Sequence, residues 1–206
     1  MILYYSVQHV VDDIINCGVP FDLDPIHIGG TRWPIFSQSQ ADAKALYEPC
    51  RKIWLGSQTF LSLKAQLDAI TFPIFVSKIV CFALGSLSPR PGSDGSSSRT
   101  HAIQHAAVET LISYFKERAG HDIYCYAQDP AYSDSDKKFL ETIGIDVIED
   151  PNGFLEVDEN TFVVSISPDV PVNIIVPDLQ QPAAMLWNTP KPIHLEVQRW
   201  EEILKG

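Results

Sequence analysis

From residue 78 onward, short apolar runs alternate with amphipathic stretches. Five of the runs have the length of strands: KIVCFAL, DIYCYA, IDVI, TFVVSI and a shorter AAMLW. Continuous apolar runs are typical of strands whose two faces are both buried. Strands that alternate with helices indicate a parallel sheet covered on both sides. The pattern therefore predicts an α/β fold, a three-layer Rossmann-like parallel sheet of about five strands.

The stretches between the strands predict helices. Between residues 100 and 120, an apolar face repeats at helical spacing, made of Ile103, Ala106, Ala107, Leu111, Ile112 and Phe115. Gly120 is expected to end that helix. Ser133, with Asp136 three residues later, has the spacing of a capping box and predicts the start of the next helix. VPVNIIVPDL reads as a brief helix or turn, and HLEVQRWEEILKG as a closing helix.

The first 77 residues differ from the rest. Residues 1–37 read as irregular, and residues 40–70 as one or two helices that Pro49 breaks or kinks. Two apolar edges are expected in these helices: Ala41, Ala45 and Leu46, then Phe60, Leu63 and Leu67. The predicted organisation is an N-terminal extension (1–77), irregular and then a helical cap, followed by a Rossmann-like domain (78–206).

Length and composition limit the class of protein. A chain of 206 residues suits one α/β domain with a full core. No segment approaches the roughly 20 apolar residues that span a bilayer, and the N-terminus lacks the features of a secretory signal. The four cysteines are scattered without CxxC spacing, which favours small buried side chains in a reducing compartment. We therefore expect a cytoplasmic or nuclear protein without a membrane partner.

The net charge of −11 is unevenly distributed. Residues 121–160 hold 2 basic and 11 acidic side chains, a net charge of −9. Such a chain binds nucleic acid poorly through its overall field, so an RNA partner would need a local basic patch. Candidates for that patch are Arg51, Lys52, Lys64, Lys78, Arg90 and Arg99. The acidic segment itself suits either solubility or a pocket for a cation.

The position of a ligand site follows from the fold. In open parallel sheets, ligands bind beyond the carboxyl ends of the strands. The loops at those ends are GSLSPR, QDPAYSD, EDPNGF and SPDVP. These loops are rich in polar residues, so they are the first places to look for chemistry.

The loop after the first strand offers Gly85 and Ser86. Gly85 allows close approach of the backbone, and Ser86 is the candidate nucleophile. The plainer interpretation is a glycine turn whose serine bonds its own loop. The stretch is not G-x-G-x-x-G, so no dinucleotide cofactor is expected, and a NAD(P)-dependent oxidoreductase is disfavoured.

The first turn of the following helix carries Gln104 and His105. His101 and His105 share a helix face, but no third ligand or HExxH pattern accompanies them, so we expect no metal. Facing the site, His105 would act as a base and Gln104 would contact substrate. Alternatively, these polar side chains are simply solvated.

The loop after the second strand brings Gln128, Asp129 and Tyr132. Asp129 could act as a base or bind an amine or guanidinium group, or it could only form an Asx turn. Tyr132 could stack on a ligand or anchor the loop. Further acids that would contact substrate are Asp150, Glu156 and Asp158.

Several of these stretches resemble a known family. QDPAYSDSDKKFLETIGI and DPNGFLEVDENT are the most specific, with KIVCFALGSL, QHAAVETL and PAAMLW beside them. Together, over about residues 78–188, they resemble fungal members of the family named for plant sensitivity to red light reduced. Residues 1–77 carry no resemblance that we can name.

The resemblance extends to a fungal branch, the arginine-containing cyclodipeptide synthases. It implies an enzyme of fungal secondary metabolism that joins arginine to a second amino acid from their aminoacyl-tRNAs, without a cofactor. Acyl transfer would use Ser86, His105 and Asp129 as catalytic residues. Substrate would contact Gly85, Gln104, Gln128, Tyr132, Asp150, Glu156 and Asp158. The alternative is a non-enzymatic regulatory or ligand-binding module of the same family; the oligomeric state stays open.

Overall fold

The centre of the molecule is a five-stranded parallel sheet. The computed structural model describes residues 39–72, 75–89, 95–166 and 168–187. Its strands are β1 (Lys78–Phe82), β2 (Tyr124–Gln128), β3 (Asp146–Val147), β4 (Thr161–Ser165) and β5 (Ala184–Trp187). They are all parallel, in the order β3-β2-β1-β4-β5. This order matches the first five positions of the doubly wound nucleotide-binding sheet and confirms the predicted class.

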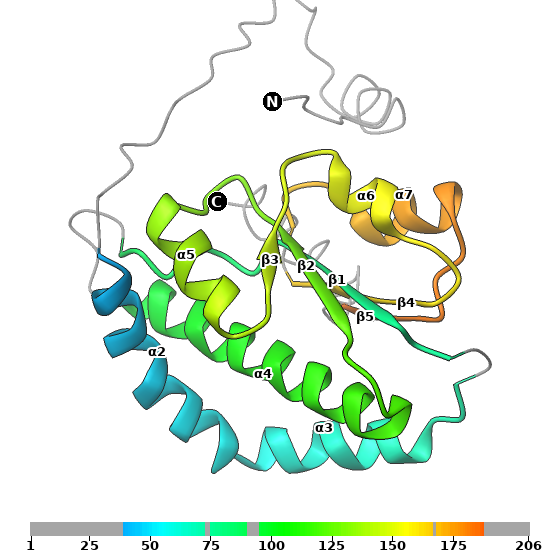
Figure 1. Ribbon diagram of the computed structural model, residues 1–206, viewed down its shortest axis with the longest axis horizontal. Helices are drawn as coiled ribbons and strands as arrows, with labels where there is room; N and C mark the ends of the chain where they lie inside the picture. The colour runs from blue at the N-terminus through cyan, green and yellow to red at the C-terminus, as the bar shows by residue number, and fades with distance from the viewer. Residues whose placement is uncertain (1–38, 73–74, 90–94, 167, 188–206) are drawn as a thin grey trace, which may run out of the picture.

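Helices cover both faces of this sheet. They are α2 (Gln40–Leu55), α3 (Gln58–Ala69), α4 (Ser96–Ala119), α5 (Asp134–Thr142), α6 (Asn152–Glu156) and α7 (Val172–Leu179). Figure 1 shows α4 and α5 on one face and α6 and α7 on the other. Along β1, Ile79 and Cys81 belong to the first core, and Val80 and Phe82 to the second. Because both faces are buried after Lys78, the rest of β1 has no polar positions, which explains its continuous apolar run.

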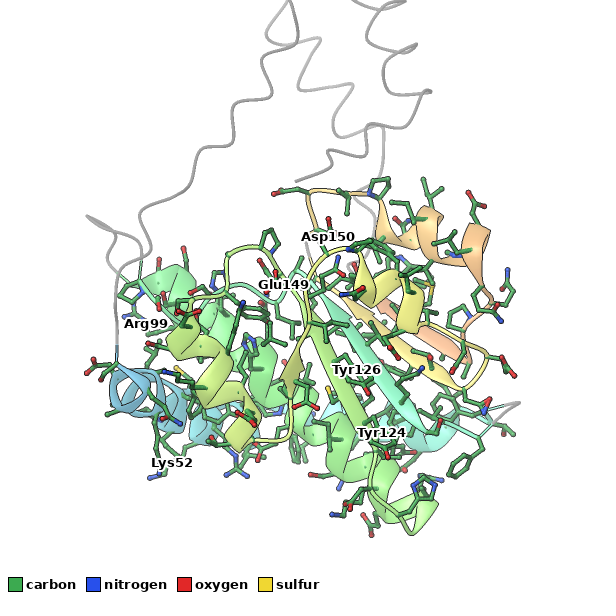
Figure 2. The ribbon with its side chains drawn as sticks, turned by 45° about the horizontal axis from the view of Figure 1, so that its top comes forward. Lys52, Arg99, Tyr124, Tyr126, Glu149 and Asp150 are labelled. Atoms are coloured by element: carbon green, nitrogen blue, oxygen red, sulfur yellow. The ribbon has the colours of Figure 1, made fainter. Side chains whose placement is uncertain are left out.

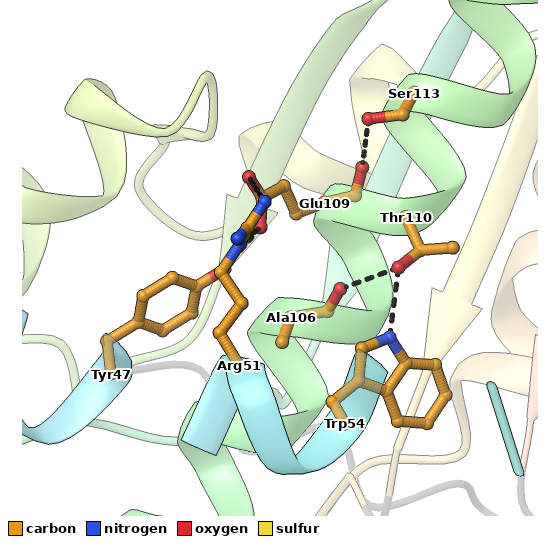
Figure 3. Close-up of polar contacts among 7 residues, drawn as sticks. All are labelled: Tyr47, Arg51, Trp54, Ala106, Glu109, Thr110 and Ser113. Atoms are coloured by element: carbon orange, nitrogen blue, oxygen red, sulfur yellow. Dashed lines mark hydrogen bonds and ion pairs between the residues drawn. The ribbon is translucent and has the colours of Figure 1, made fainter. Parts of the chain in front are cut away.

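Helix α2 lies along the outer side of α4, away from the sheet (Figure 1). Polar contacts fix the pair, as Figure 3 shows: Tyr47 Oη donates to Glu109 Oε2 at 2.9 Å, and Arg51 pairs with the same carboxylate. Trp54 Nε1 donates to Thr110 Oγ1 at 2.9 Å. The first core therefore includes the N-terminal helices. The predicted boundary between residues 77 and 78 stays a prediction.

The buried face of α2 is not the one that the sequence predicted. Its buried residues are Ala43, Tyr47, Cys50 and Trp54, whereas Ala41 and Ala45 are exposed and Leu46 is half-buried. Large aromatic side chains bury more area than alanine, so they decide which face turns inward. The predicted inner edge of α3 is confirmed, with Leu67 buried and Phe60 and Leu63 half-buried.

Pro49 does not break the helical run. Helix α2 continues through it, and the break comes at Gly56 and Ser57 instead. The Ser57 side chain accepts a hydrogen bond from the backbone N–H of Phe60 and so caps α3. A serine that can satisfy an unpaired helix N–H is a stronger boundary here than a proline.

Other predictions vary in accuracy. Helix α4 begins at Ser96, four residues earlier than expected, and Gly120 ends it at φ +72°, as predicted. The capping box of α5 is confirmed, but the five-residue α6 was not predicted. The expectations for residues 1–37 and for a closing helix near the C-terminus lie outside the described residues. Cys50, Cys81 and Cys125 are buried free thiols, as expected.

Replacing Tyr47 tests whether α2 is part of the folding unit. Tyr47 is 1% exposed and packs edge-on against Phe139 at 5.1 Å between ring centroids. We expect Tyr47→Ala to lower the free energy of unfolding by about 3–5 kcal/mol, measured by urea denaturation. The control Ala45→Ser changes an exposed position of α2 and should stay within about 0.5 kcal/mol. Equal stability of the two variants would contradict the packing described above.

Candidate functional site at the carboxyl edge of the sheet

The carboxyl ends of β1, β2 and β3 bring several predicted residues together. Asp129 Oδ2 accepts a hydrogen bond from the backbone N–H of Gly85 at 2.8 Å. Gln128 Nε2 donates to Asp150 Oδ1 at 2.9 Å. Figure 2 shows Glu149 and Asp150 together at this end of the sheet, with Tyr124, the first residue of β2, at the other. Loops that are distant in sequence therefore meet at one edge, as the parallel topology requires.

Asp129 connects two of these loops. Its Oδ2 takes the Gly85 N–H, and its Oδ1 takes the backbone N–H of Ala131 at 2.8 Å. Gly85 has φ +76°, and a Cβ there would lie 2.4 Å from the His101 ring, so only glycine fits. Asp129 thus forms the Asx turn that was one of its two interpretations. Each carboxylate oxygen keeps a lone pair for a further donor.

Asp136 is the most heavily bonded carboxylate of the edge. It is fully buried and accepts from Ser86 Oγ at 2.7 Å, from the Leu87 N–H at 3.2 Å, and from the N–H and hydroxyl of Ser133 at 2.8 Å each. The sequence predicted only its cap on α5. The sequence did not predict its hydrogen bonds to Ser86 and Leu87 in the loop after β1, because the spacing of a capping box contains no information about contacts 50 residues away.

Ser86 is held by this carboxylate rather than by a histidine. Its hydroxyl donates to Asp136, and its own oxygen accepts the Ser88 N–H at 2.9 Å. The carbonyl of Ser86 lies 2.8 Å from His101 Nδ1. The described contacts therefore contain a serine–carboxylate pair and no serine–histidine pair of the kind used for nucleophile activation.

His105 and Tyr132 form a buried pair beneath the loops. His105 Nδ1 lies 2.7 Å from the His101 carbonyl, so Nδ1 carries the proton and Nε2 accepts from Tyr132 Oη at 2.9 Å. Burial lowers the pKa of His105 to about 4, because the charged imidazolium loses its hydration. Burial likewise raises the pKa of Tyr132 well above its ordinary value. Both groups are therefore neutral at pH 7.

A small polar cavity lies between the loops after β2 and β3. Its volume is about 80 Å³, and its polar lining comes from Gln128, Asp129, Tyr132, Lys137, Glu149 and Asp150. Lys137 Nζ bonds Glu149 Oε1 at 2.6 Å. Sequence reasoning missed Lys137 and Glu149, because nothing in their spacing shows that α5 and the loop after β3 face each other.

Gln128 lines this cavity, and hydrogen bonds hold its side chain in place. Its Oε1 accepts the Gly153 N–H at 2.7 Å while its Nε2 donates to Asp150, so both ends of the amide are used. A Cβ on Gly153 would lie 2.7 Å from that Oε1, so a larger residue here would have to displace the Gln128 amide. Gln128 therefore orients Asp150 toward the cavity.

Three predicted residues do not join this group. Glu156 and Asp158 pair with Lys78 Nζ at 3.3 and 3.0 Å, and Lys78 begins β1, so they lie at the amino end of the sheet. Gln104 lies on α4 and touches none of the groups above through a hydrogen bond; its Oε1 is buried without a partner among the described residues.

In the same described part of the chain, no three His, Cys, Asp or Glu side chains gather to hold a metal ion.

Comparison with known proteins identifies the family. A model of the SRR1 domain, named for sensitivity to red light reduced, matches residues 63–199. The chain belongs to the SRR1 domain family. This confirms the family resemblance, and it carries no statement about the cyclodipeptide synthase branch. No curated protein and no solved structure matches the chain.

The SRR1 match extends beyond the residues that suggested it. It begins within α3, upstream of the stretch in which the resemblance was recognised, and runs past β5. The cavity, its loops and the Asp136 network all lie inside the matched range. Across the described residues, no helix of this SRR1 protein has the length and apolar character needed to cross a bilayer.

The buried His105 predicts a pH-dependent stability. Its pKa is about 4 when folded and about 6.5 when unfolded, so the unfolded chain binds the proton more readily. Its neutral form supports the fold fully above pH 6.5, and that support falls by about 3 kcal/mol as the pH drops to 4. Urea denaturation at pH 7, 5.5 and 4 should therefore show a steeper loss for wild type than for His105→Gln. Parallel pH profiles for the two proteins would refute this origin.

Proposed function

We propose that this SRR1 domain binds the guanidinium or ammonium group of a small molecule in the cavity at the carboxyl edge. The observation that carries the proposal is the charge of the cavity lining: the three carboxylates of Asp129, Glu149 and Asp150 outnumber the single ammonium group of Lys137 and leave a formal charge of −2. Carboxylates recognise guanidinium groups through paired hydrogen bonds and ammonium groups through single ones. Asp129 and Asp150 each keep free lone pairs after their bonds within the protein.

The size of the cavity limits what enters it. Sites that enclose a whole ligand usually measure about 300–1,000 Å³, whereas this one measures about 80 Å³. It therefore suits the charged end of a ligand, with the rest of the molecule lying over the loops outside. An arginyl side chain, long and charged only at its tip, has that form.

A more specific proposal is that the reaction served by this site is aminoacyl transfer. The Ser86 hydroxyl attacks the ester of one aminoacyl-tRNA; an acyl–serine ester forms, the tRNA ester breaks, and the freed tRNA hydroxyl takes a proton. The α-amine of this acyl group attacks the ester of the second aminoacyl-tRNA, so an amide bond forms and the second tRNA leaves with a free hydroxyl. The remaining α-amine attacks the serine ester, which closes an arginine-containing cyclic dipeptide and restores the serine hydroxyl. The contact that supports Ser86 as acyl acceptor is its 2.7 Å bond to Asp136, a carboxylate placed to take its proton. Figure 2 shows Lys52 and Arg99 on the flank of α2 and α4, where we propose that the tRNA lies.

A second candidate is a binding module without turnover. It is favoured by the way in which the polar groups of the edge are already paired. His105 bonds Tyr132, Asp129 bonds two backbone N–H groups, and Asp136 accepts four hydrogen bonds. When the hydrogen-bonding groups of a site are already paired with one another, the site is rigid and few of its groups are free to transfer a proton. Both candidates share the cation site and differ only in turnover.

Calorimetric titration with Nα-acetyl-L-argininamide tests the cation site. We expect wild type to bind this compound and Asp150→Asn to bind it about fivefold more weakly, the effect of one exposed carboxylate. The matched control is Asp146→Asn, which removes the same charge from an exposed residue of β3 that does not line the cavity. Equal weakening by both variants, or no binding to wild type, would refute the site.

Turnover tests the synthase proposal separately. The protein is incubated with arginyl-tRNA and each other aminoacyl-tRNA in turn, and products are identified by mass spectrometry. We expect a cyclic dipeptide that contains arginine and that ribonuclease abolishes. Asp129→Asn should reduce its yield at least tenfold, because the Gly85 loop loses its anchor. No product with any partner would exclude the synthase and leave the binding module, and full activity of Asp129→Asn would remove Asp129 from the site.

A further inference from the structure

Lys137 is the one cation in the lining of the cavity. It follows the capping box of α5, four residues after Ser133, whose carbonyl accepts its backbone N–H. Its side chain reaches across to the loop after β3 and bonds Glu149 Oε1 at 2.6 Å. The Lys137 side chain is 37% exposed and that of Glu149 is 78% exposed. The ammonium group therefore lies at the rim of the site, within reach of solvent.

The helix dipole does not favour a lysine at this position. The first turn of a helix carries partial positive charge and attracts anions such as Asp134 and Asp136 in α5. Asp134 and Glu141, three and four residues from Lys137 on the same helix, offset part of this repulsion. The ion pair of Lys137 is nevertheless with Glu149, across the cavity, so its side chain is directed to the site.

We propose that Lys137 is an internal counter-ion. Its ammonium group occupies the cation position of the site when no ligand is bound, and an incoming cation displaces it. The inference rests on the proposed cation site and adds to it a residue that sets its specificity. An ion pair with these exposures changes an equilibrium constant by no more than about fivefold. Lys137 can therefore leave Glu149 and move into water without a large penalty, which makes displacement feasible.

Displacement discriminates between ligands. A ligand ammonium group that replaces the Lys137 ammonium exchanges one point charge for another, so it gains little. A guanidinium group is planar and presents several N–H donors, so it can contact two of the three carboxylates at once. A guanidinium group that contacts Asp129 and Asp150 need not take Glu149 from Lys137, whereas an ammonium group that binds Glu149 must do so. With Lys137 in place, the site therefore favours guanidinium over ammonium. Without Lys137, a ligand ammonium group can pair with Glu149 without displacing another cation. The ratio of the affinities for guanidinium and ammonium ligands therefore becomes smaller.

The experiment compares two singly charged probes on three proteins, each comprising all 206 residues of the chain. The probes are Nα-acetyl-L-argininamide and Nα-acetyl-L-lysinamide, titrated by calorimetry into wild type, Lys137→Met and Lys138→Met. Methionine keeps an unbranched chain with high helix propensity and removes the charge. Lys138 is the matched control, since it is exposed, adjacent on the same helix, and absent from the cavity lining. Urea denaturation of each protein establishes that it is folded.

We expect Lys137→Met to bind the lysinamide about fivefold more tightly than wild type and to bind the argininamide with a smaller gain. The gain should shrink at 0.5 M salt, because exposed charges are screened. Lys138→Met should match wild type with both probes. A gain that is equal in the two variants would reflect overall charge and overturn the proposal.

The outcomes separate this inference from the cation site itself. If wild type binds the argininamide and Lys137→Met shows no gain for the lysinamide, the cation site stands and the role of Lys137 is refuted. If only Lys137→Met binds, both proposals fail for the natural chain, because no probe displaces Lys137 and wild type has no working cation site. If none of the three proteins binds either probe, both proposals fail.

Discussion

The carboxylate of Asp136 is the interaction on which the carboxyl edge depends. A fully buried carboxylate is costly unless donors replace its hydration. Here four donors do so, two from the loop after β1 and two from Ser133 at the start of α5. One side chain therefore both begins a helix and fixes the neighbouring loop. Asp129, seven residues earlier, repeats the arrangement by holding Gly85.

These hydrogen bonds show that part of the negative charge of residues 121–160 stabilises the fold. Residues 121–160 carry a net charge of −9, which by itself suits solubility or a cation pocket equally well. In the structure, Asp129, Asp136 and Asp158 accept hydrogen bonds from the backbone or from hydroxyl groups, so part of that charge serves folding. Two of the remaining carboxylates, Glu149 and Asp150, line the cavity in which we propose that a cation binds. A count of charges along the chain cannot separate these two uses, because it ignores which carboxylates find donors.

Much of the fold was predictable, because its strands are buried on both sides and its caps are local. The apolar run of β1 and the Ser133 capping box are signals contained in a few adjacent residues. The face of α2 was not predictable in this way, since both of its candidate faces carry apolar residues. The choice between them depends on contacts with α4, where Tyr47 and Trp54 find hydrogen-bond partners. Glu156 and Asp158 failed to join the site for a similar reason. The short α6 carries the chain from the carboxyl edge back to Lys78, and a five-residue helix gives almost no periodic signal.

The sequence therefore predicted which loops meet at the carboxyl edge, but it predicted only some of the hydrogen-bond partners of their side chains. Strand order determines which loops meet, so Gly85, Asp129 and Asp150 could be placed together from the sequence. Hydrogen-bond partners depend on where side chains lie in three dimensions, and these show that the inner groups of the edge are occupied by one another. Under the proposed function, a ligand would be recognised through the remaining lone pairs and through the charges at the rim, without reorganising the interior. A preorganised edge lowers the cost of ordering side chains on binding, so the proposed choice between ligands would fall to the exposed charges around the opening rather than to the buried residues.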